Sequence, residues 1–186
     1  MPNFSAKNLS QFIEIVASEI GPRNLPTVLI KSGFPVEWAD AEAARNLSAT
    51  IAAKAYADLQ QAIRTYYGRG ARGTLQRIGS NLWGHLLDNA PFSLKAKSKL
   101  VLMMPESMRR KAALDLLARL LSSKSGDVTV HTLDLDLLLV DHNSPGAKGQ
   151  HDDEPICYVT QGLIREALYW ATEKELDVEE SCCQAM

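Results

Sequence analysis

Cysteine and carboxylate side chains lie together near the end of the chain, in VEESCCQAM. Thiolates and carboxylates are ligands for zinc, and cysteines also form disulfide frameworks. The sequence has 3 cysteines in 186 residues, at Cys157, Cys182 and Cys183. This number excludes a disulfide-rich scaffold, and a bridge between two adjacent cysteines is strained. A metal site and buried thiols beside a solvated acidic edge remain as alternatives.

A second group of possible metal ligands lies in one polar segment, DHNSPGAKGQHDDEP. The group consists of His142, His151, Asp152, Asp153 and Glu154. Imidazole and carboxylate groups can bind a divalent ion. Their irregular spacing and the high polarity of the segment favour a flexible acidic loop instead.

Glycines and arginines alternate in GRGARG, residues 68–73. Backbone amides beside arginine can hold a phosphate, but the Lys-Ser/Thr pair of a P-loop is missing and no apolar strand precedes the motif. We therefore expect a helix break with solvated arginines. The sequence also lacks a dinucleotide fingerprint and a nucleophile with a matched base, so it predicts no catalytic residues.

The composition is typical of a compact domain, with 46% hydrophobic and 23% charged residues. Such a chain is neither disordered nor fibrous. A formal net charge of -2 provides no basic field, which argues against nucleic acid as a partner. The N-terminus shows no signal-peptide pattern, and no apolar run approaches the roughly 20 residues of a membrane span. We expect one cytoplasmic domain covering residues 1–186.

Hydrophobic periodicity predicts that residues 1–125 are mainly helical. The segment LPTVLIKSGFP, which contains glycine and proline, is expected to be a connector. The predicted helices are an amphipathic helix at about 9–20, one or two alanine-rich helices at 38–67, a helix over 75–86, and two helices within 93–123 divided by Pro105.

After Gly126 the hydrophobic period changes from helical to alternating in VTVHTLDLDLLLV, which predicts one long strand or two strands in a bend. Helical spacing returns at 156–174, and ELDVEES alternates again as a predicted strand. The expected fold class is α+β, in which a helical N-terminal half packs on a small antiparallel sheet.

Soft and aromatic side chains on the predicted helices can line an apolar ligand pocket. The candidates are Trp83, Met103, Met108, Tyr158 and Trp170. The same residues also fit an ordinary core, and the sequence leaves both interpretations open. The small side chains of residues 38–67 allow close approach of a second copy, so we expect a homodimer.

The segment CYVTQGLIREALYWATEKELDVEESCCQAM resembles the C-terminal part of the 4-vinyl reductase domain, a predicted hydrocarbon-binding family. In that family a Cys-led helix containing glycine precedes a Val-Glu-rich strand and a cysteine. Cys157, Gly162, Val178, Glu180 and Cys183 occupy those places here. The clear match covers about residues 127–186, and the preceding helical segments agree in pattern only.

The family includes small-molecule binders, a protein of bacteriochlorophyll synthesis and aromatic-sensing domains of bacterial transcription regulators. It also looks related in fold to the transport-particle (TRAPP) subunits of vesicle tethering, and so to ligand-binding domains of the NO-signalling and Golgi-transport type. The resemblance implies a carrier or sensor that binds a hydrocarbon, an aromatic or a tetrapyrrole-like molecule between the helical half and the sheet. An accessory protein of (bacterio)chlorophyll and tetrapyrrole synthesis, and a scaffold resembling the tethering subunits, are the alternatives.

The resemblance further implies a structural zinc ion, because the spacing of Cys157, Glu180 and Cys183 matches the first three zinc ligands of the aromatic sensors. The fourth cysteine of those sensors, and the closing strand that carries it, would fall beyond Met186. A missing tail, a water or another chain would then supply the fourth ligand.

The local geometry sets two conditions on this metal site. A helix from Cys157 that returns antiparallel to the following strand would bring the far end of that strand back to the helix start, so the three ligands should lie close together. On an uninterrupted strand Glu180 and Cys183 point to opposite faces, so a bulge or strand end is needed near Ser181. Cys182, which shares the face of Glu180, is the reserve ligand.

Overall fold

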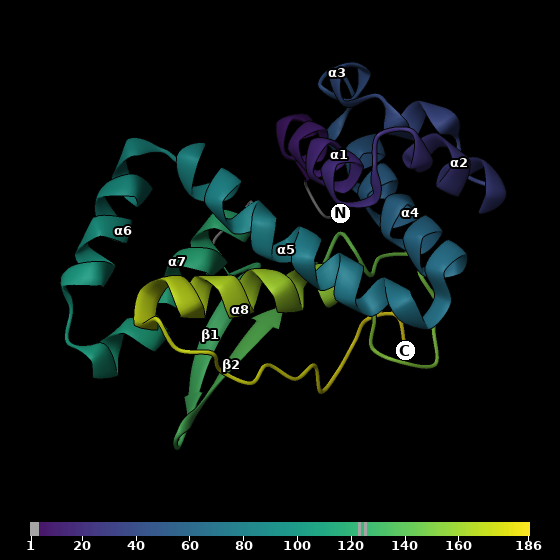
Figure 1. Cartoon of the computed structure of the whole chain (residues 1–186). Coiled ribbons are helices and arrows are strands. Elements are labelled where there is room, and N and C mark those ends of the chain that lie inside the picture. The colour runs from purple at the N-terminus through teal and green to yellow at the C-terminus, as the bar shows by residue number, and fades with distance from the viewer. Residues whose placement is uncertain (1–3, 123, 125) are drawn as a thin grey trace.

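Helices α1 to α4 form one end of the molecule in the computed structural model, which describes residues 4–122, 124 and 126–186 (Figure 1). The Ser5 side chain caps α1 by accepting a hydrogen bond from the Asn8 backbone N–H at 3.1 Å. Leu9, Phe12 and Val16 then form the buried stripe that the periodicity predicts. The elements here are α1 (Ala6–Ile20), α2 (Asn24–Lys31), the 3-10 helix η1 (Val36–Ala39), α3 (Ala41–Ala44) and α4 (Ala49–Tyr67).

The prediction of a connector at LPTVLIKSGFP is wrong, because most of this segment forms α2. Pro26 lies in the first turn of the helix, where a backbone N–H has no helical partner and its loss costs little. Leu25, Val28 and Leu29 are buried, so burial of an apolar stripe outweighs the breaking tendency of the proline. The helix ends before Gly33, whose φ is +79°.

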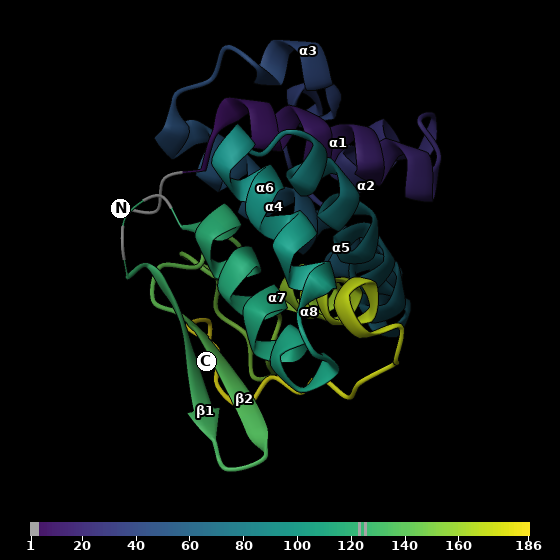
Figure 2. The same ribbon diagram turned by 90° about the vertical axis from the view of Figure 1, so that its left-hand side faces the viewer.

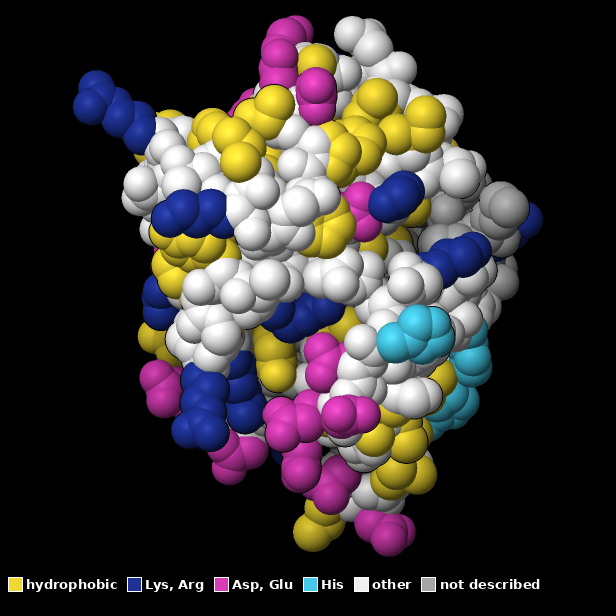
Figure 3. All heavy atoms as spheres, turned by 90° about the vertical axis from the view of Figure 1, so that its right-hand side faces the viewer, with side chains coloured by type: hydrophobic (Ala, Val, Ile, Leu, Met, Phe, Trp, Pro, Cys, Tyr) yellow, Lys and Arg dark blue, Asp and Glu magenta, His cyan; other side chains and the backbone are white. Residues whose placement is uncertain are grey.

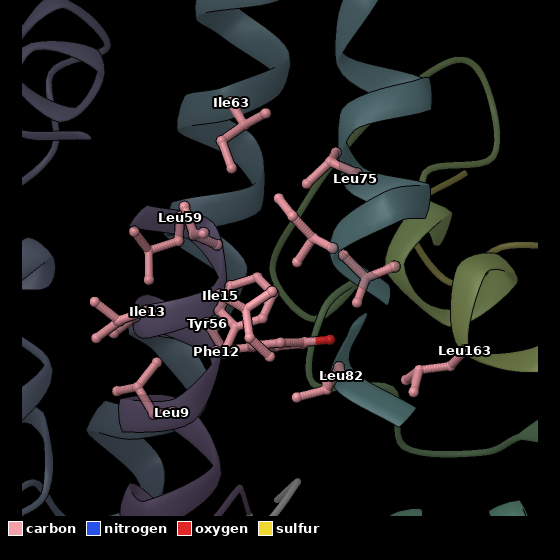
Figure 4. Close-up of a cluster of buried hydrophobic side chains, with 14 of the residues drawn as sticks. Leu9, Phe12, Ile13, Ile15, Tyr56, Leu59, Ile63, Leu75, Leu82 and Leu163 are labelled. Carbon is pink, nitrogen blue, oxygen red and sulfur yellow. The ribbon is translucent and has the colours of Figure 1, made fainter. Parts of the chain in front are cut away.

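The alanine-rich segment divides into α3 and α4, and Ser48 caps α4 by accepting from the Ile51 backbone N–H at 3.4 Å. Ala52, Ala55 and Ala62 are fully buried within this chain. Figure 4 shows α4 side chains facing those of α1 and α5 in the same cluster. The small-residue face that we expected to pair two copies therefore packs inside one copy, and the homodimer stays a prediction without that surface.

Helices α5 (Ala71–Asp88) and α8 (Tyr158–Thr172) make the most extensive contact between elements of the described residues. GRGARG forms the short 3-10 helix η2 (Gly68–Gly70) and the start of α5, which confirms the predicted helix break. The two long helices cross closely, because a Cβ on Gly79 would lie 2.1 Å from the Val159 carbonyl oxygen and one on Gly162 would lie 2.0 Å from the Gln76 carbonyl oxygen. Only glycine permits this approach.

Helices α6 (Phe92–Met103) and α7 (Glu106–Leu121) are separated at Pro105 as predicted. Residue 123, the end of the predicted helical range, lies outside the described residues. None of the described helices combines the length and apolar character that crossing a membrane requires.

The alternating segment after Gly126 forms the antiparallel hairpin of β1 (Val128–Leu133) and β2 (Asp136–Asp141). Figure 2 shows this hairpin projecting beyond the helices. The mainly helical chain with a small antiparallel sheet confirms the predicted α+β fold class.

The prediction of a strand at ELDVEES is wrong. Residues 173–186, which we call the C-terminal tail, contain no strand, and β1 and β2 pair only with each other among the described residues. An alternating sequence forms a strand only where a neighbouring edge takes up its backbone hydrogen bonds. The tail instead bonds to the loop before α8, through the Asp152 N–H and the Ala185 carbonyl oxygen at 2.9 Å.

The helix crossing makes Gly162→Ala strongly destabilising, because the new methyl group would collide with the backbone of α5. We expect a loss of about 1–3 kcal/mol or more of unfolding free energy, as for other overpacked cores. Gly84→Ala is the matched control, since Gly84 lies exposed on α5 with open space around it. That change should stabilise the protein by about 0.5–1 kcal/mol. Chemical denaturation of both variants measures the difference, and equal effects would contradict the close crossing.

Candidate metal centre and adjoining groove

The structure brings Cys157, Glu180 and Cys183 together, as the sequence predicts. One ligand atom from each residue lies within 4.8 Å of the other two, and the two sulfur atoms are 3.7 Å apart. Cys157 immediately precedes α8, whereas Glu180 and Cys183 belong to the tail. Figure 1 shows how the tail turns at the end of α8 and runs back past the hairpin toward the helix start.

The donor set and its spacing suit a zinc ion. Zinc–sulfur bonds of about 2.3 Å that meet at a tetrahedral angle place two sulfur atoms about 3.8 Å apart. The Cys157 and Cys183 sulfur atoms are separated by 3.7 Å. Two thiolates with one carboxylate are also ligands that zinc accepts readily. The residues therefore fit three positions of a tetrahedral site.

Hydrogen bonds hold the Glu180 carboxylate in place. Its Oε2 accepts from the backbone N–H of Cys157 at 3.0 Å and from the Gln161 Nε2 at 3.1 Å. These donors come from the start of α8, so the helix fixes a side chain of the tail. The sequence analysis did not identify Gln161, and its spacing of four residues from Cys157 was the available signal, because that spacing places both on one helix face.

The end of the tail packs against the loop before α8. Ala185, Ala147 and Ile156 form a small buried cluster that the two site cysteines contact. The Gln184 side chain donates to the His142 carbonyl oxygen at 2.9 Å. The ligands are therefore held in place by packing and hydrogen bonding around them.

The two thiols and the carboxylate lie so close together that their charged forms repel one another. A bound cation or protonation would relieve this repulsion. Burial raises the pKa of the Cys157 thiol, and the neighbouring Glu180 carboxylate and Cys183 add to the shift. Arg64 of α4 interacts electrostatically with both thiols, although burial lowers its pKa. Without a metal ion, Cys157 therefore stays protonated at neutral pH.

Cys182 is not part of the cluster, and it is exposed whereas Cys183 is partly buried. The sequence analysis required a bulge or strand end to turn Glu180 and Cys183 to one side. The irregular tail removes that requirement, since the strict alternation of side chains applies only to a strand.

The loop cluster of His142, His151, Asp152, Asp153 and Glu154 forms no metal-binding group in the part of the chain that the structure describes. The five residues lie in an irregular segment, as predicted, and all are exposed. Asp152 lies 3.9 Å from the Arg64 Nε as an ion pair. Figure 3 views the side of the molecule that carries this loop and shows acidic side chains gathered near histidines on it.

A groove of about 880 Å³ adjoins the metal centre. We call it the tail groove. Leu114 of α7, Ile164 and Leu168 of α8, residues 135–141 of the hairpin and residues 176–184 of the tail all line it. A smaller cavity of about 60 Å³ lies among α1, α4, α5, α7, α8 and the hairpin, and it shares the lining residues Asp141, Ser144 and Thr160 with the groove.

The predicted pocket residues do not gather around either space. Trp83 is buried and packs edge-to-face on Trp170, with ring centroids 5.4 Å apart. Met103 and Met108 have exposed fractions of 80% and 56%. The Arg72 guanidinium lies over the Tyr158 ring, with its Cζ atom 5.9 Å from the ring centroid. None of the five lines the tail groove or the small cavity.

The residues that do line the groove include the consecutive leucines Leu137, Leu138 and Leu139 of β2. The available signal was the run LLLV. In a half-buried strand apolar residues alternate with polar ones, whereas this run places apolar side chains on both faces.

Comparisons of the chain with protein-family models, with curated proteins and with solved structures find no match.

The cysteine geometry leads to a test by metal titration. The metal-free protein should take up one zinc ion, Cys183→Ser should lose most of the affinity, and Cys182→Ser should retain it because Cys182 lies outside the cluster. Affinity should fall as the pH is lowered, since protons compete with the metal for the Cys157 thiol, whose pKa is raised. Competition with a chromophoric chelator at several pH values measures this, and equal affinities for the two serine variants would contradict the site.

Proposed function

We propose that this protein binds an apolar small molecule in the tail groove, as a carrier or sensor, and that a zinc ion fastens the tail that forms one wall of the groove. One observation carries the proposal: Cys157, Glu180 and Cys183 are themselves among the residues that line the groove. A metal centre there and a ligand site beside it would share the same segment of chain.

The size and lining of the groove support an apolar ligand. Binding sites for small molecules commonly have volumes of about 300–1,000 Å³ and mainly apolar walls. The tail groove, at about 880 Å³, falls within that range. Its apolar side chains come from four elements and include Leu114, Leu139, Ile164, Leu168 and Val178.

Polar and charged side chains, among them five carboxylates, also line the groove and could orient such a ligand. Arg110 of α7 and Thr160 of α8 are among its lining residues. A small number of polar groups in an apolar site fixes orientation and selects among ligands of similar shape. This lining suits a hydrocarbon or aromatic molecule that also carries polar groups.

Zinc would act here as a structural ion held by Cys157, Glu180 and Cys183. When bound, it would link the start of α8 to the tail and contribute its binding energy to the folded state. The tail has no strand pairing among the described residues, so this link would limit its movement and preserve the groove wall. The chain's own residues provide the remaining attachment through Gln184 and Ala185.

We also propose membership of the 4-vinyl reductase family, with a cytoplasmic homodimer as the working form. The close helix crossing supplies a physical reason for glycine at position 162, one of the positions that carry the resemblance. Light scattering over a range of concentrations tests the dimer, and a monomer mass at every concentration would contradict it.

Ligand binding can be tested with the neutral fluorescent probe N-phenyl-1-naphthylamine on zinc-loaded protein. Leu138→Lys places a charge in the tail groove and should weaken probe binding by about tenfold or more, equivalent to about 1.4 kcal/mol. Leu102→Lys is the control, because Leu102 lies on α6 outside the groove. The exposed fractions of the two leucines are similar, 36% for Leu138 and 42% for Leu102.

Equal probe affinity in the two lysine variants would overturn the groove assignment. Native mass spectrometry of protein purified without added metal provides the second measurement, because it detects zinc, a retained ligand and the subunit number together. A tetrapyrrole in that spectrum would favour the pigment-synthesis alternative. The scaffold alternative predicts neither a retained ligand nor probe binding.

A further inference from the structure

We propose that Gln161 and Gln76 are positioning residues of the metal centre, which hold the Glu180 carboxylate so that its Oε1 remains available to the ion. The inference rests on the zinc centre of the proposed function and extends it to a buried side chain on α8, Gln161, and a partly buried one on α5, Gln76. Neither glutamine would contact the metal.

A continuous chain of hydrogen bonds connects α5 to the centre. The Gln161 Nε2 donates to the Glu180 Oε2 at 3.1 Å, and the Gln76 Nε2 donates to the Gln161 Oε1 at 2.9 Å. A carboxylate only accepts hydrogen bonds, so the Gln161 NH₂ group must face Glu180 and its carbonyl oxygen must face Gln76. The negative charge of Glu180 therefore determines which group donates and which accepts in each of these hydrogen bonds.

Both nitrogen donors bond to the same oxygen of Glu180, and the Cys157 thiol also interacts with this carboxylate. Oε2 accepts from the Cys157 backbone N–H and from Gln161, which occupies both of its lone pairs. Neither bond uses Oε1. A carboxylate held in this way has a fixed orientation before the metal arrives, so less conformational entropy is lost on binding.

The close crossing of α5 and α8 places the two glutamines within hydrogen-bonding distance. Gln161 directly precedes Gly162, and Gly162 contacts the backbone of Gln76. The Ser80 hydroxyl donates to the Gly162 carbonyl oxygen at 3.3 Å, which adds a second polar link across the crossing. Gln161 also lies one turn after Cys157, whose carbonyl oxygen accepts from the Gln161 backbone N–H at 2.9 Å.

The burial of Gln161 distinguishes this arrangement from a surface contact. Its exposed fraction is 5%, so the side-chain amide cannot exchange its partners for water without opening the helix pair. An ordinary buried polar pair would account for the Gln76–Gln161 bond alone. The additional bond from Gln161 to the Glu180 carboxylate connects the helix pair to the centre.

The test is a double-mutant cycle with Gln161→Met, Gln76→Met and the double variant. Gln161→Met should weaken zinc binding by about 10–100-fold, the usual effect of losing a group that orients a metal ligand. Gln76→Met should weaken it less, and it should add no further loss when Gln161 is already Met. The double variant replaces both partners with apolar groups of similar shape, which keeps the fold close to its original stability.

Gln60→Met is the matched control, because Gln60 has an exposed fraction of 2% and its side chain donates to the Tyr56 carbonyl oxygen instead of to a ligand residue of the centre. It should alter thermal stability without altering zinc affinity. Cobalt(II) provides a spectroscopic measurement: its thiolate charge-transfer band should persist in Gln161→Met, whereas its ligand-field bands should change as the carboxylate loses its orientation.

Two results would overturn the inference at different points. Wild-type protein that binds neither zinc nor cobalt would remove the metal centre of the proposed function and the positioning role with it. Wild-type protein that binds zinc, with Gln161→Met and Gln60→Met of equal affinity, would remove only the positioning role.

Discussion

The close crossing of α5 and α8 is the contact on which the rest of the structure depends. Gly79 and Gly162 let two helix backbones approach to a distance that no side chain permits. This approach fixes the direction of α8, and therefore the positions of Cys157 at its start and of the tail at its end. The metal-ligand cluster and one wall of the tail groove both follow from the placement of this single helix.

The tail is ordered by side chains instead of by a sheet. Its backbone joins no strand among the described residues, yet Glu180 bonds to the start of α8, Gln184 bonds to the loop before it, and Ala185 is buried. These contacts concentrate two thiols and a carboxylate at one point. Such a concentration is costly unless protons or a cation compensate it, which is the physical reason for proposing a metal ion at this point.

Predictions from periodicity succeeded where a repeated apolar pattern coincided with clear stop signals. The helix at 9–20, the division at Pro105 and the hairpin after Gly126 are examples. They failed at α2, where buried leucines outweighed a proline that lies harmlessly in the first turn. The predicted pocket residues also failed to meet in space, because helical spacing reports which residues share a face but not what covers that face.

The sequence by itself determined the α+β class and, through its resemblance to the 4-vinyl reductase domain, indicated the three residues that meet at the candidate metal centre. Those features depend on local patterns and on residue chemistry. The tertiary structure decided that ELDVEES is not a strand, that the alanine face of α4 packs within its own chain, and that Gln161 connects Gln76 to Glu180. Each of these depends on which segments become neighbours, because a strand needs a paired edge and a buried amide needs partners from distant parts of the chain.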